Sequence, residues 1–181
     1  MRDGYIKVAA ATPSLKVADC EYNSEEIYSN ACSAYDNGAN IVVFPELAIT
    51  GYTCGDLFLQ EKLLRAAREE LLALTKKTAK MDMLIVVGLP LTVGYKLYNV
   101  QAFISRGQIL GIVPKTYLPN YSEFYEARHF ARLTKTMSTV RLEDKDIPFG
   151  TNILFRCSTL KELVVAGELC EDIWAPNPPS I

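Results

Sequence analysis

Apolar and polar residues follow two patterns along the first half of the chain. Three short and almost wholly apolar runs, at 5–11, 40–44 and 83–89, predict buried strands. The run at 40–44 is typical of a strand covered on both faces. Between the runs lie two longer segments in which apolar residues recur at helical spacing. Strands that alternate with helices in this order indicate an α/β layered sheet.

The two periodic segments predict one long helix each. The first helix is expected to begin at about Ser24, with Asn23 as its N-cap and Glu26 completing a capping box, and to end at Gly38. The second is expected over about 60–80. Its buried face is predicted to consist of Leu63, Ala67, Leu71 (or Leu74) and Thr78.

The pattern changes in the second half of the chain, where strands dominate. Runs at 97–105 and 108–113 predict two strands, joined by a tight hairpin turn at Arg106 and Gly107. Such a turn needs residues that accept a positive φ angle, and glycine accepts it readily.

A long segment at 117–150 lacks any regular apolar pattern and is rich in aromatic and charged residues. It predicts a loop, with one helical turn near 123–129. Short apolar runs at 153–156 and 163–166 predict the last two strands.

The composition limits the class of protein. The chain has 181 residues, with 19 basic against 21 acidic residues, a net charge of −2 and no basic cluster. This charge distribution argues against a nucleic-acid partner. No apolar run is long enough to span a membrane, and the apolar stretch in residues 1–10 is too short for a signal peptide. These features predict a cytoplasmic, single-domain protein.

The five cysteines and the single histidine, His129, limit the metal chemistry. No CxxC pair occurs, so no structural zinc site is expected. Without a secretion signal, the thiols are expected to be reduced. Cys20, Cys32, Cys54 and Cys157 are interpreted as structural or incidental.

Three apolar runs end in residues that can take part in catalysis. The run IVVFPE ends at Glu46, ILGIVPK ends at Lys115 and LVVAGELC ends at Cys170. Ligands of open α/β sheets bind outside the carboxyl ends of the strands. Three neighbouring strands that end in this way would bring a carboxylate, an ammonium and a thiol together.

This trio suits acyl transfer. A thiol is mostly protonated at neutral pH, and an ammonium stabilises both its thiolate and a later oxyanion. A carboxylate whose pKa is raised by burial can take the thiol proton and pass it to a leaving amine. The backbone N–H of Glu171 is a candidate for the second oxyanion donor. The expected reaction proceeds through a thioester, with ammonia or an amine leaving.

Other interpretations of the same residues remain open. A cysteine at a strand end is most often a small buried hydrophobic residue. Cys54 lies close to Glu46 in sequence and is the second choice for a reactive thiol. A Cys–His pair that uses His129 is also possible, although the sequence shows no third group to orient the imidazole.

Longer segments around the three residues resemble a known family. FPELAITGYTCGDLF, PKTYLPNYSEFYEARHF and GELCEDIWAPNPPS are similar to the glutaminase domain of glutamine-dependent NAD synthetases, in the nitrilase superfamily. The resemblance implies a four-layer αββα sandwich, of which residues 1–181 form an N-terminal, truncated part. The ATP-dependent synthetase domain of that family, with its SGGxDS-like loop, has no counterpart in the sequence.

The resemblance also implies roles for individual residues. Cys170 corresponds to the nucleophile, Glu46 to the general base, and Lys115 to the group that stabilises the tetrahedral intermediate. A second glutamate that fixes the lysine corresponds to Glu126, with Glu123 as the fallback.

Glutamine must also be held by its α-amino and α-carboxylate groups. Tyr52, Tyr121 and Glu171 are candidate substrate-binding residues, because a carboxylate and hydroxyl groups suit an ammonium. Trp174 is interpreted as a packing anchor for the PNPPS segment. No residue is an evident partner for the substrate carboxylate.

The function implied by the resemblance is hydrolysis of glutamine to glutamate and ammonia, which supplies ammonia for the amidation of deamido-NAD to NAD. No metal or cofactor is expected in this chain, and ATP and Mg²⁺ would serve the synthetase domain. The implied partners are glutamine, that domain and further copies in a homo-oligomer. The alternatives are a stand-alone nitrilase-like amidase for a small amide or carbamoyl compound, and a non-catalytic docking fragment.

Overall fold

A seven-stranded sheet organises the described part of the chain, residues 4–133 and 137–180 of a computed structural model. Its strands lie in the order β1-β2-β3-β4-β5-β7-β6, and β8 and β9 form a separate two-stranded ribbon. β1 to β3 are mutually parallel, while β4 is antiparallel to both β3 and β5. The strands are β1 (Val8–Ala10), β2 (Ile41–Val43), β3 (Leu84–Val93), β4 (Lys96–Ser105), β5 (Gln108–Pro114), β6 (Met137–Leu142), β7 (Lys145–Gly150), β8 (Phe155–Arg156) and β9 (Val164–Val165).

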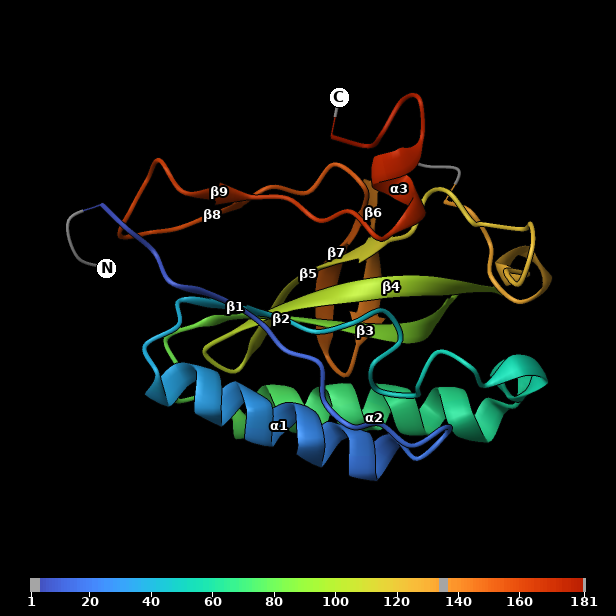
Figure 1. Ribbon diagram of the computed structural model, residues 1–181, viewed down its shortest axis with the longest axis horizontal. Coiled ribbons are helices and arrows are strands. Elements are labelled where there is room, and N and C mark those ends of the chain that lie inside the picture. The colour runs from blue at the N-terminus through green and yellow to red at the C-terminus, as the bar shows by residue number, and fades with distance from the viewer. Residues whose placement is uncertain (1–3, 134–136, 181) are drawn as a thin grey trace.

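The two long helices lie side by side against one face of the sheet, and the ribbon and α3 lie on the other side (Figure 1). This arrangement confirms the predicted α/β layered architecture. Among the described residues, none of the helices combines the length and the apolar character of a membrane span. The helices are α1 (Cys20–Asp36), α2 (Glu61–Lys77) and α3 (Glu171–Trp174), with short 3₁₀ helices at Gly55–Leu59 and Glu126–Arg128.

The main core lies between the helices and the sheet. Ile27 and Ala31 of α1 and Leu71 and Leu74 of α2 are fully buried in it. The predicted buried face of α2 is confirmed, because Leu63, Ala67 and Thr78 are buried as well. Removal of this apolar surface from water is the main stabilising contribution to the fold.

A smaller core lies on the opposite face of the sheet. Its centre is a stacked pair of rings, Phe103 of β4 and Phe155 of β8, whose centroids are 4.0 Å apart. Val86, Val113 and Leu169 complete the cluster. This core fixes the chain that leads through the ribbon to Cys170.

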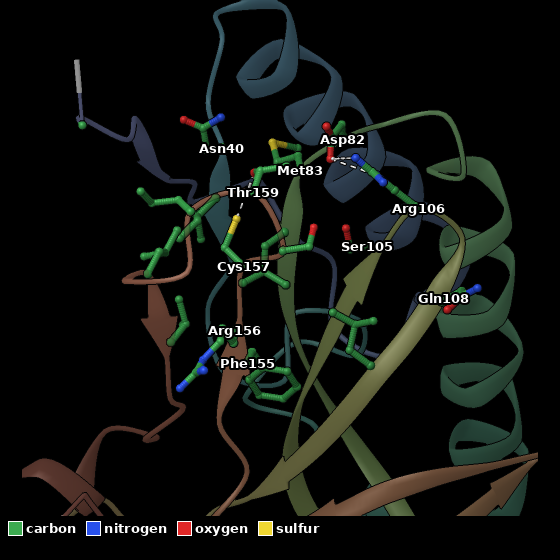
Figure 2. A pocket seen from close by; sticks show the side chains of 18 residues that line it. Asn40, Asp82, Met83, Ser105, Arg106, Gln108, Phe155, Arg156, Cys157 and Thr159 are labelled. Atoms are coloured by element: carbon green, nitrogen blue, oxygen red, sulfur yellow. Dashed lines mark hydrogen bonds and ion pairs between the residues drawn. The ribbon is translucent and has the colours of Figure 1, made fainter. Parts of the chain in front are cut away.

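A cavity of about 860 Å³ lies beside the ribbon, and Figure 2 shows its walls. Polar groups in its wall include Asn40, Arg156, Cys157 and the ion pair between Asp82 and Arg106. Glu46, Lys115 and Cys170 do not line this cavity, so the predicted chemistry lies elsewhere.

The hairpin between β4 and β5 confirms the predicted turn. Arg106 and Gly107 have φ angles of 47° and 73°, the positive values that a tight turn of this kind needs. The predicted strands at 153–156 and 163–166 are present as the shorter β8 and β9.

The predicted start of the first helix is wrong. α1 begins at Cys20, and Asp19 is its N-cap, with a side chain that accepts a hydrogen bond from the backbone N–H of Tyr22. Asn23 lies within the helix and is fully buried. Its amide donates to the carbonyls of Lys16 and Ile49, so it joins two loops instead of capping the helix.

The predicted burial of the first two strands is also wrong in part. Val8 of β1 is 58% exposed and Val43 of β2 is 40% exposed. Both strands lie at the β1 edge of the sheet, beyond the part covered by the smaller core. In β2 only Ile41 and Val42 are buried, and no residue of β1 is.

The predicted loop at 117–150 contains a hairpin that sequence analysis missed. β6 and β7 pair in antiparallel fashion and extend the sheet beyond β5. Charged residues and Pro148 interrupt their apolar pattern, which hid the alternation. The helical turn predicted near 123–129 is present as Glu126–Arg128. Residues 134–136 of this segment lie outside the described residues.

The main core makes a stability prediction. Leu74→Ala is expected to lower the free energy of unfolding by about 2–5 kcal/mol, because it leaves a cavity under α2. Leu59→Ala is the matched control, since Leu59 is 63% exposed, and its effect is expected to stay below about 0.5 kcal/mol. Urea unfolding of both variants measures the difference, and equal effects would contradict the assignment of the core.

Candidate active site

A buried lysine side chain lies between two carboxylates. Lys115 Nζ lies 2.8 Å from Glu126 Oε1 and 3.0 Å from Glu46 Oε1, and it donates to Glu46 Oε2 at 3.1 Å. The lysine side chain is fully buried, and those of Glu46 and Glu126 are 17% and 5% exposed. A buried ammonium is tolerated only when such partners compensate for its lost hydration.

Glu46 reaches the lysine because the chain after β2 crosses over β3. The backbone N–H of Phe44 donates to Val86 O, and that of Ile49 donates to Gly88 O. A Cβ at Gly88 would lie only 2.5 Å from the backbone nitrogen of Leu47. Glycine is therefore required at this crossing.

The prediction that three neighbouring strands end at the site is wrong. β2 and β5 are separated by β3 and β4, and Cys170 follows the separate ribbon, not a strand of the large sheet. Glu46 and Lys115 nevertheless meet, through the crossing chain and the length of the lysine side chain.

Asn99 is a site residue that sequence analysis missed. Its side-chain Nδ2 donates to Glu46 Oε2 at 3.0 Å, and its backbone carbonyl accepts from the backbone N–H of Lys115. The residue is 1% exposed. The available signal was a polar residue inside the apolar run at 97–105.

Glu126 occupies the position beside the lysine that the resemblance implied. Its Oε1 accepts hydrogen bonds from Lys115 Nζ and from the hydroxyl of Tyr52, both at 2.8 Å. Glu123, the fallback, is exposed. Asp56 pairs with Arg128 and His129 and so fixes the position of the 3₁₀ helix that begins at Glu126.

Cys170 lies on the ribbon side of the sheet, directly before α3. Its side chain is exposed, and its backbone has a φ of 43° and a ψ of −98°, a conformation that L-residues rarely adopt. Gly167 lies three residues before it. A Cβ there would overlap Gln101 and come within 2.8 Å of Phe103, so glycine lets this segment lie close to the sheet.

The charges of the lysine and the two glutamates act on the thiol of Cys170. On balance the pKa of this partly exposed thiol is raised, because partial burial, Glu46 and Glu126 together outweigh the lowering effect of the Lys115 ammonium. The backbone N–H of Glu171, next to this thiol, also lowers the pKa. This N–H is the group that sequence analysis proposed as an oxyanion donor.

The pKa values of Glu46 and Lys115 are both raised, but for different reasons. Burial raises the pKa of Glu46, against the opposing effect of Lys115. Burial opposes the charge of Lys115, but Glu46 and Glu126 outweigh it, and the net pKa of the ammonium is raised. The raised pKa makes Glu46 a stronger base than an ordinary carboxylate, while Lys115 stays charged.

Two of the predicted substrate-binding residues meet at the edge of the site. The hydroxyl of Tyr121 donates to Glu171 Oε2 at 2.9 Å, and the pair is exposed. The third, Tyr52, is 40% exposed, and its hydroxyl is bound to Glu126. The prediction that Trp174 anchors the PNPPS segment is wrong, because Trp174 is 78% exposed. Tyr117 contacts that segment instead, through a hydrogen bond to the carbonyl of Asn177.

Cys54 and His129, the alternative reactive groups, each contact residues other than Glu46, Lys115 and Cys170. Cys54 is buried, its thiol lies 3.2 Å from the carbonyl of Thr50, and burial raises its pKa. His129 has the orienting group that the sequence did not reveal, since its Nε2 lies 3.0 Å from Asp56 Oδ1. Across residues 4–133 and 137–180, no group of three or more His, Cys, Asp or Glu side chains is arranged to hold a metal ion.

Comparisons with known proteins agree with this geometry. A model of the carbon-nitrogen hydrolase family matches residues 7–180. The glutamine-dependent NAD(+) synthetase of Mycobacterium tuberculosis (strain H37Rv) is 41% identical over 177 residues, which cover 98% of this chain and 26% of that protein. The synthetase of Aquifex aeolicus is 31% identical over 172 residues, 95% of this chain and 27% of that protein. The chain thus spans about a quarter of the length of these relatives.

Solved structures show the same fold. The crystal structure of a glutamine-dependent NAD(+) synthetase from Cytophaga hutchinsonii superposes with a TM-score of 0.84 at 28% identity, over 92% of this chain and 28% of that one. An amidase from Nesterenkonia sp. gives a TM-score of 0.63 at 19% identity, over 82% and 56% of the two chains. The similarity to the amidase concerns the fold alone. The nitrilase-like fold and the resemblance to NAD synthetases, both predicted from the sequence, are confirmed.

The charges around Cys170 make a prediction about its reactivity. Lys115→Met removes the nearby charge that lowers the thiol pKa most, so the pH midpoint of Cys170 alkylation by iodoacetamide is expected to rise. The rate at neutral pH is expected to fall by roughly three- to tenfold. Mass spectrometry of the full-length protein measures both quantities.

The matched control is Lys77→Met, because Lys77 is a surface lysine paired with Glu25. It should leave the alkylation profile unchanged. A Lys115→Met protein that melts cooperatively but keeps the wild-type midpoint would contradict the assigned electrostatics.

Proposed function

Because the chain belongs to the carbon-nitrogen hydrolase family, which matches residues 7–180, we propose that it hydrolyses the side-chain amide of glutamine to glutamate and ammonia. The observation that carries the proposal is the buried Glu46–Lys115–Glu126 cluster, whose charges act on the thiol of Cys170. Similarity to glutamine-dependent NAD synthetases over 98% of the chain supports glutamine as the substrate.

The first half-reaction forms a thioester. Cys170 Sγ attacks the amide carbon of glutamine, and Glu46 takes the thiol proton. The carbonyl oxygen becomes an oxyanion, which the Lys115 ammonium and the backbone N–H of Glu171 stabilise. Collapse of this intermediate breaks the C–N bond. Glu46 gives its proton to the departing nitrogen, so that ammonia leaves and the acyl group stays on sulfur.

The second half-reaction releases glutamate. Glu46 takes a proton from a water molecule, and the hydroxide attacks the thioester carbon. The same donors stabilise the second oxyanion, and the C–S bond breaks. The proton returns to the sulfur of Cys170. One glutamine and one water are converted to glutamate and ammonia, and the enzyme is restored.

Glu126 and Tyr52 hold the lysine in place during both steps. Glu126 Oε1 accepts from the Lys115 ammonium and from the Tyr52 hydroxyl, which keeps the ammonium aimed at the site. Burial and the neighbouring Glu126 raise the pKa of Tyr52, so the hydroxyl stays protonated and remains a donor. Its ring can still form a wall of the substrate pocket.

The α-amino group of glutamine is assigned to Glu171 and Tyr121. Glu171 directly follows the nucleophile, and its carboxylate accepts from the Tyr121 hydroxyl. A carboxylate with a neighbouring hydroxyl suits an ammonium ligand. No partner for the substrate carboxylate is assigned within the described residues.

We further propose that the ammonia serves a synthetase domain that amidates deamido-NAD. The relatives that carry this name are about four times longer than this chain. Glutamine hydrolysis as written uses only side-chain and backbone groups of this chain and water, and ATP and Mg²⁺ would act at the synthetase domain. Assembly as a homo-oligomer is part of the proposal. All five cysteines are free thiols, which suits the reducing cytoplasm.

Ammonia release from glutamine tests the function in the full-length protein. Cys170→Ala is expected to abolish it, and Glu46→Gln is expected to lower kcat by about 10²–10⁴-fold, because the general base is lost. Cys54→Ala is the control for the second thiol and should retain turnover.

Simple aliphatic amides and N-carbamoyl amino acids are compared in the same assay. Glutamine is expected to give the highest kcat/KM. A higher kcat/KM for a simple amide or carbamoyl compound would replace the proposed function by that of a nitrilase-like amidase. No turnover of any amide by the folded protein would indicate a non-catalytic module.

A further inference from the structure

Asp172, two residues after the nucleophile, lies between two segments of the site and is 1% exposed. Its Oδ1 accepts hydrogen bonds from the backbone N–H groups of Thr116 at 2.9 Å and Tyr117 at 2.7 Å. Its Oδ2 accepts from the backbone N–H of Leu169 at 3.1 Å. One buried carboxylate therefore binds the backbone that follows Lys115 and the backbone that precedes Cys170.

We propose that Asp172 is a positioning residue that sets the separation between the Lys115 ammonium and the Cys170 thiol through these three backbone contacts. The reaction that it supports is the one proposed above, and to that extent the inference rests on the proposed function. Asp172 touches neither the substrate nor the reacting atoms in this role. It acts through Lys115 and Cys170.

Other hydrogen bonds join the same segments, but they lie at the surface. The Tyr117 hydroxyl donates to Asn177 O, and the Tyr121 hydroxyl donates to Glu171 Oε2, both in exposed positions. Water competes for these hydroxyl groups, so each of the two hydrogen bonds does little to fix the relative position of the segments. Asp172 itself is 1% exposed, so loss of these contacts would leave its buried carboxylate oxygens without partners.

The backbone of Cys170 needs the restraint that Asp172 supplies. Its φ of 43° and ψ of −98° are unfavourable for a residue with a side chain. Such a conformation persists only when the surroundings hold it. Asp172 holds the preceding residue twice, because its carboxylate accepts from Leu169 N–H and its own N–H donates to Leu169 O. The N–H of Ile173 donates to Cys170 O and closes the turn.

The chemistry of the three contacts requires a carboxylate. All three partners are N–H donors, and an ionised carboxylate has acceptor sites on both oxygens. An asparagine could keep the two contacts with Thr116 and Tyr117 through its oxygen. Its NH₂ group would then face the N–H of Leu169, donor against donor. Asp172→Asn therefore keeps the size of the side chain and its contacts with Thr116 and Tyr117, but it loses the contact with Leu169 in the segment that carries Cys170.

The test compares Asp172→Asn and Asp172→Ala with the control Asp82→Asn in the full-length protein. Asp82 is an exposed carboxylate that pairs with Arg106, away from the site. Three quantities are measured for each variant: the pH profile of Cys170 alkylation by iodoacetamide, the kcat and KM for glutamine, and the melting temperature.

Asp172→Asn is expected to lower the kcat for glutamine by about tenfold to a hundredfold, the effect of a small misplacement of reacting groups, with KM changed less than threefold. The alkylation midpoint should move to higher pH, because the ammonium no longer lies at its fixed distance from the thiol. Asp172→Ala should show larger changes of the same kind, and Asp82→Asn none.

Wild-type kinetics and an unchanged alkylation midpoint in a folded Asp172→Asn protein would overturn the proposal. A loss of kcat that only follows the unfolded fraction would also overturn it. If neither variant folds, amide hydrogen exchange of the wild type decides. Thr116, Tyr117 and Leu169 are expected to exchange at least about a hundredfold more slowly than unstructured amides, and unprotected amides would overturn the proposal.

Failure of this proposal can be told apart from failure of the proposed function. Alkylation of Cys170 does not depend on glutamine, so it tests Asp172 even if the wild type releases no ammonia from glutamine. Conversely, glutamine turnover that survives Asp172→Asn unchanged supports the function and removes the positioning role.

Discussion

The rest of the site depends on one buried ammonium and its two carboxylates. Breaking a buried ion pair by removing one partner costs about 3–5 kcal/mol, because the other charge is left without compensation. Lys115, Glu46 and Glu126 come from three separate segments, so their mutual attraction draws those segments together. Asn99 and Tyr52 add hydrogen bonds to the carboxylates. In the proposed mechanism this arrangement supplies a proton acceptor and a fixed positive charge.

Sheet geometry explains how distant segments reach the same place. The chain that carries Glu46 crosses β3 at Gly88, and the chain that carries Cys170 crosses β4 near Gly167. At both crossings a Cβ on the glycine would overlap neighbouring atoms. The absence of a side chain there lets the crossing segment pack closely against the sheet. Asp172 then joins the cysteine segment to the end of β5. The site is therefore built on the face of the sheet opposite the helices.

The sequence predicted those features that depend on local pattern. The periodic burial of α2 and the β4–β5 turn followed from apolar spacing and from Gly107, and Glu126 beside Lys115 followed from family resemblance. The contacts of Tyr52 and Asn99 depend on tertiary packing, which no local pattern encodes. The β6–β7 hairpin was missed because charged residues and a proline masked its alternation, and the start of α1 because a buried asparagine resembles a cap.

The central claim is that Cys170 is the nucleophile of a site that binds glutamine. Its most direct test is intact-mass labelling of the full-length protein with a diazo-ketone analogue of glutamine, on the wild type and on Cys170→Ala, with circular dichroism to verify folding. The account predicts a single adduct on the wild type that glutamine blocks and that is absent from the variant. No adduct on the folded wild type, or an adduct that persists in Cys170→Ala, would contradict it.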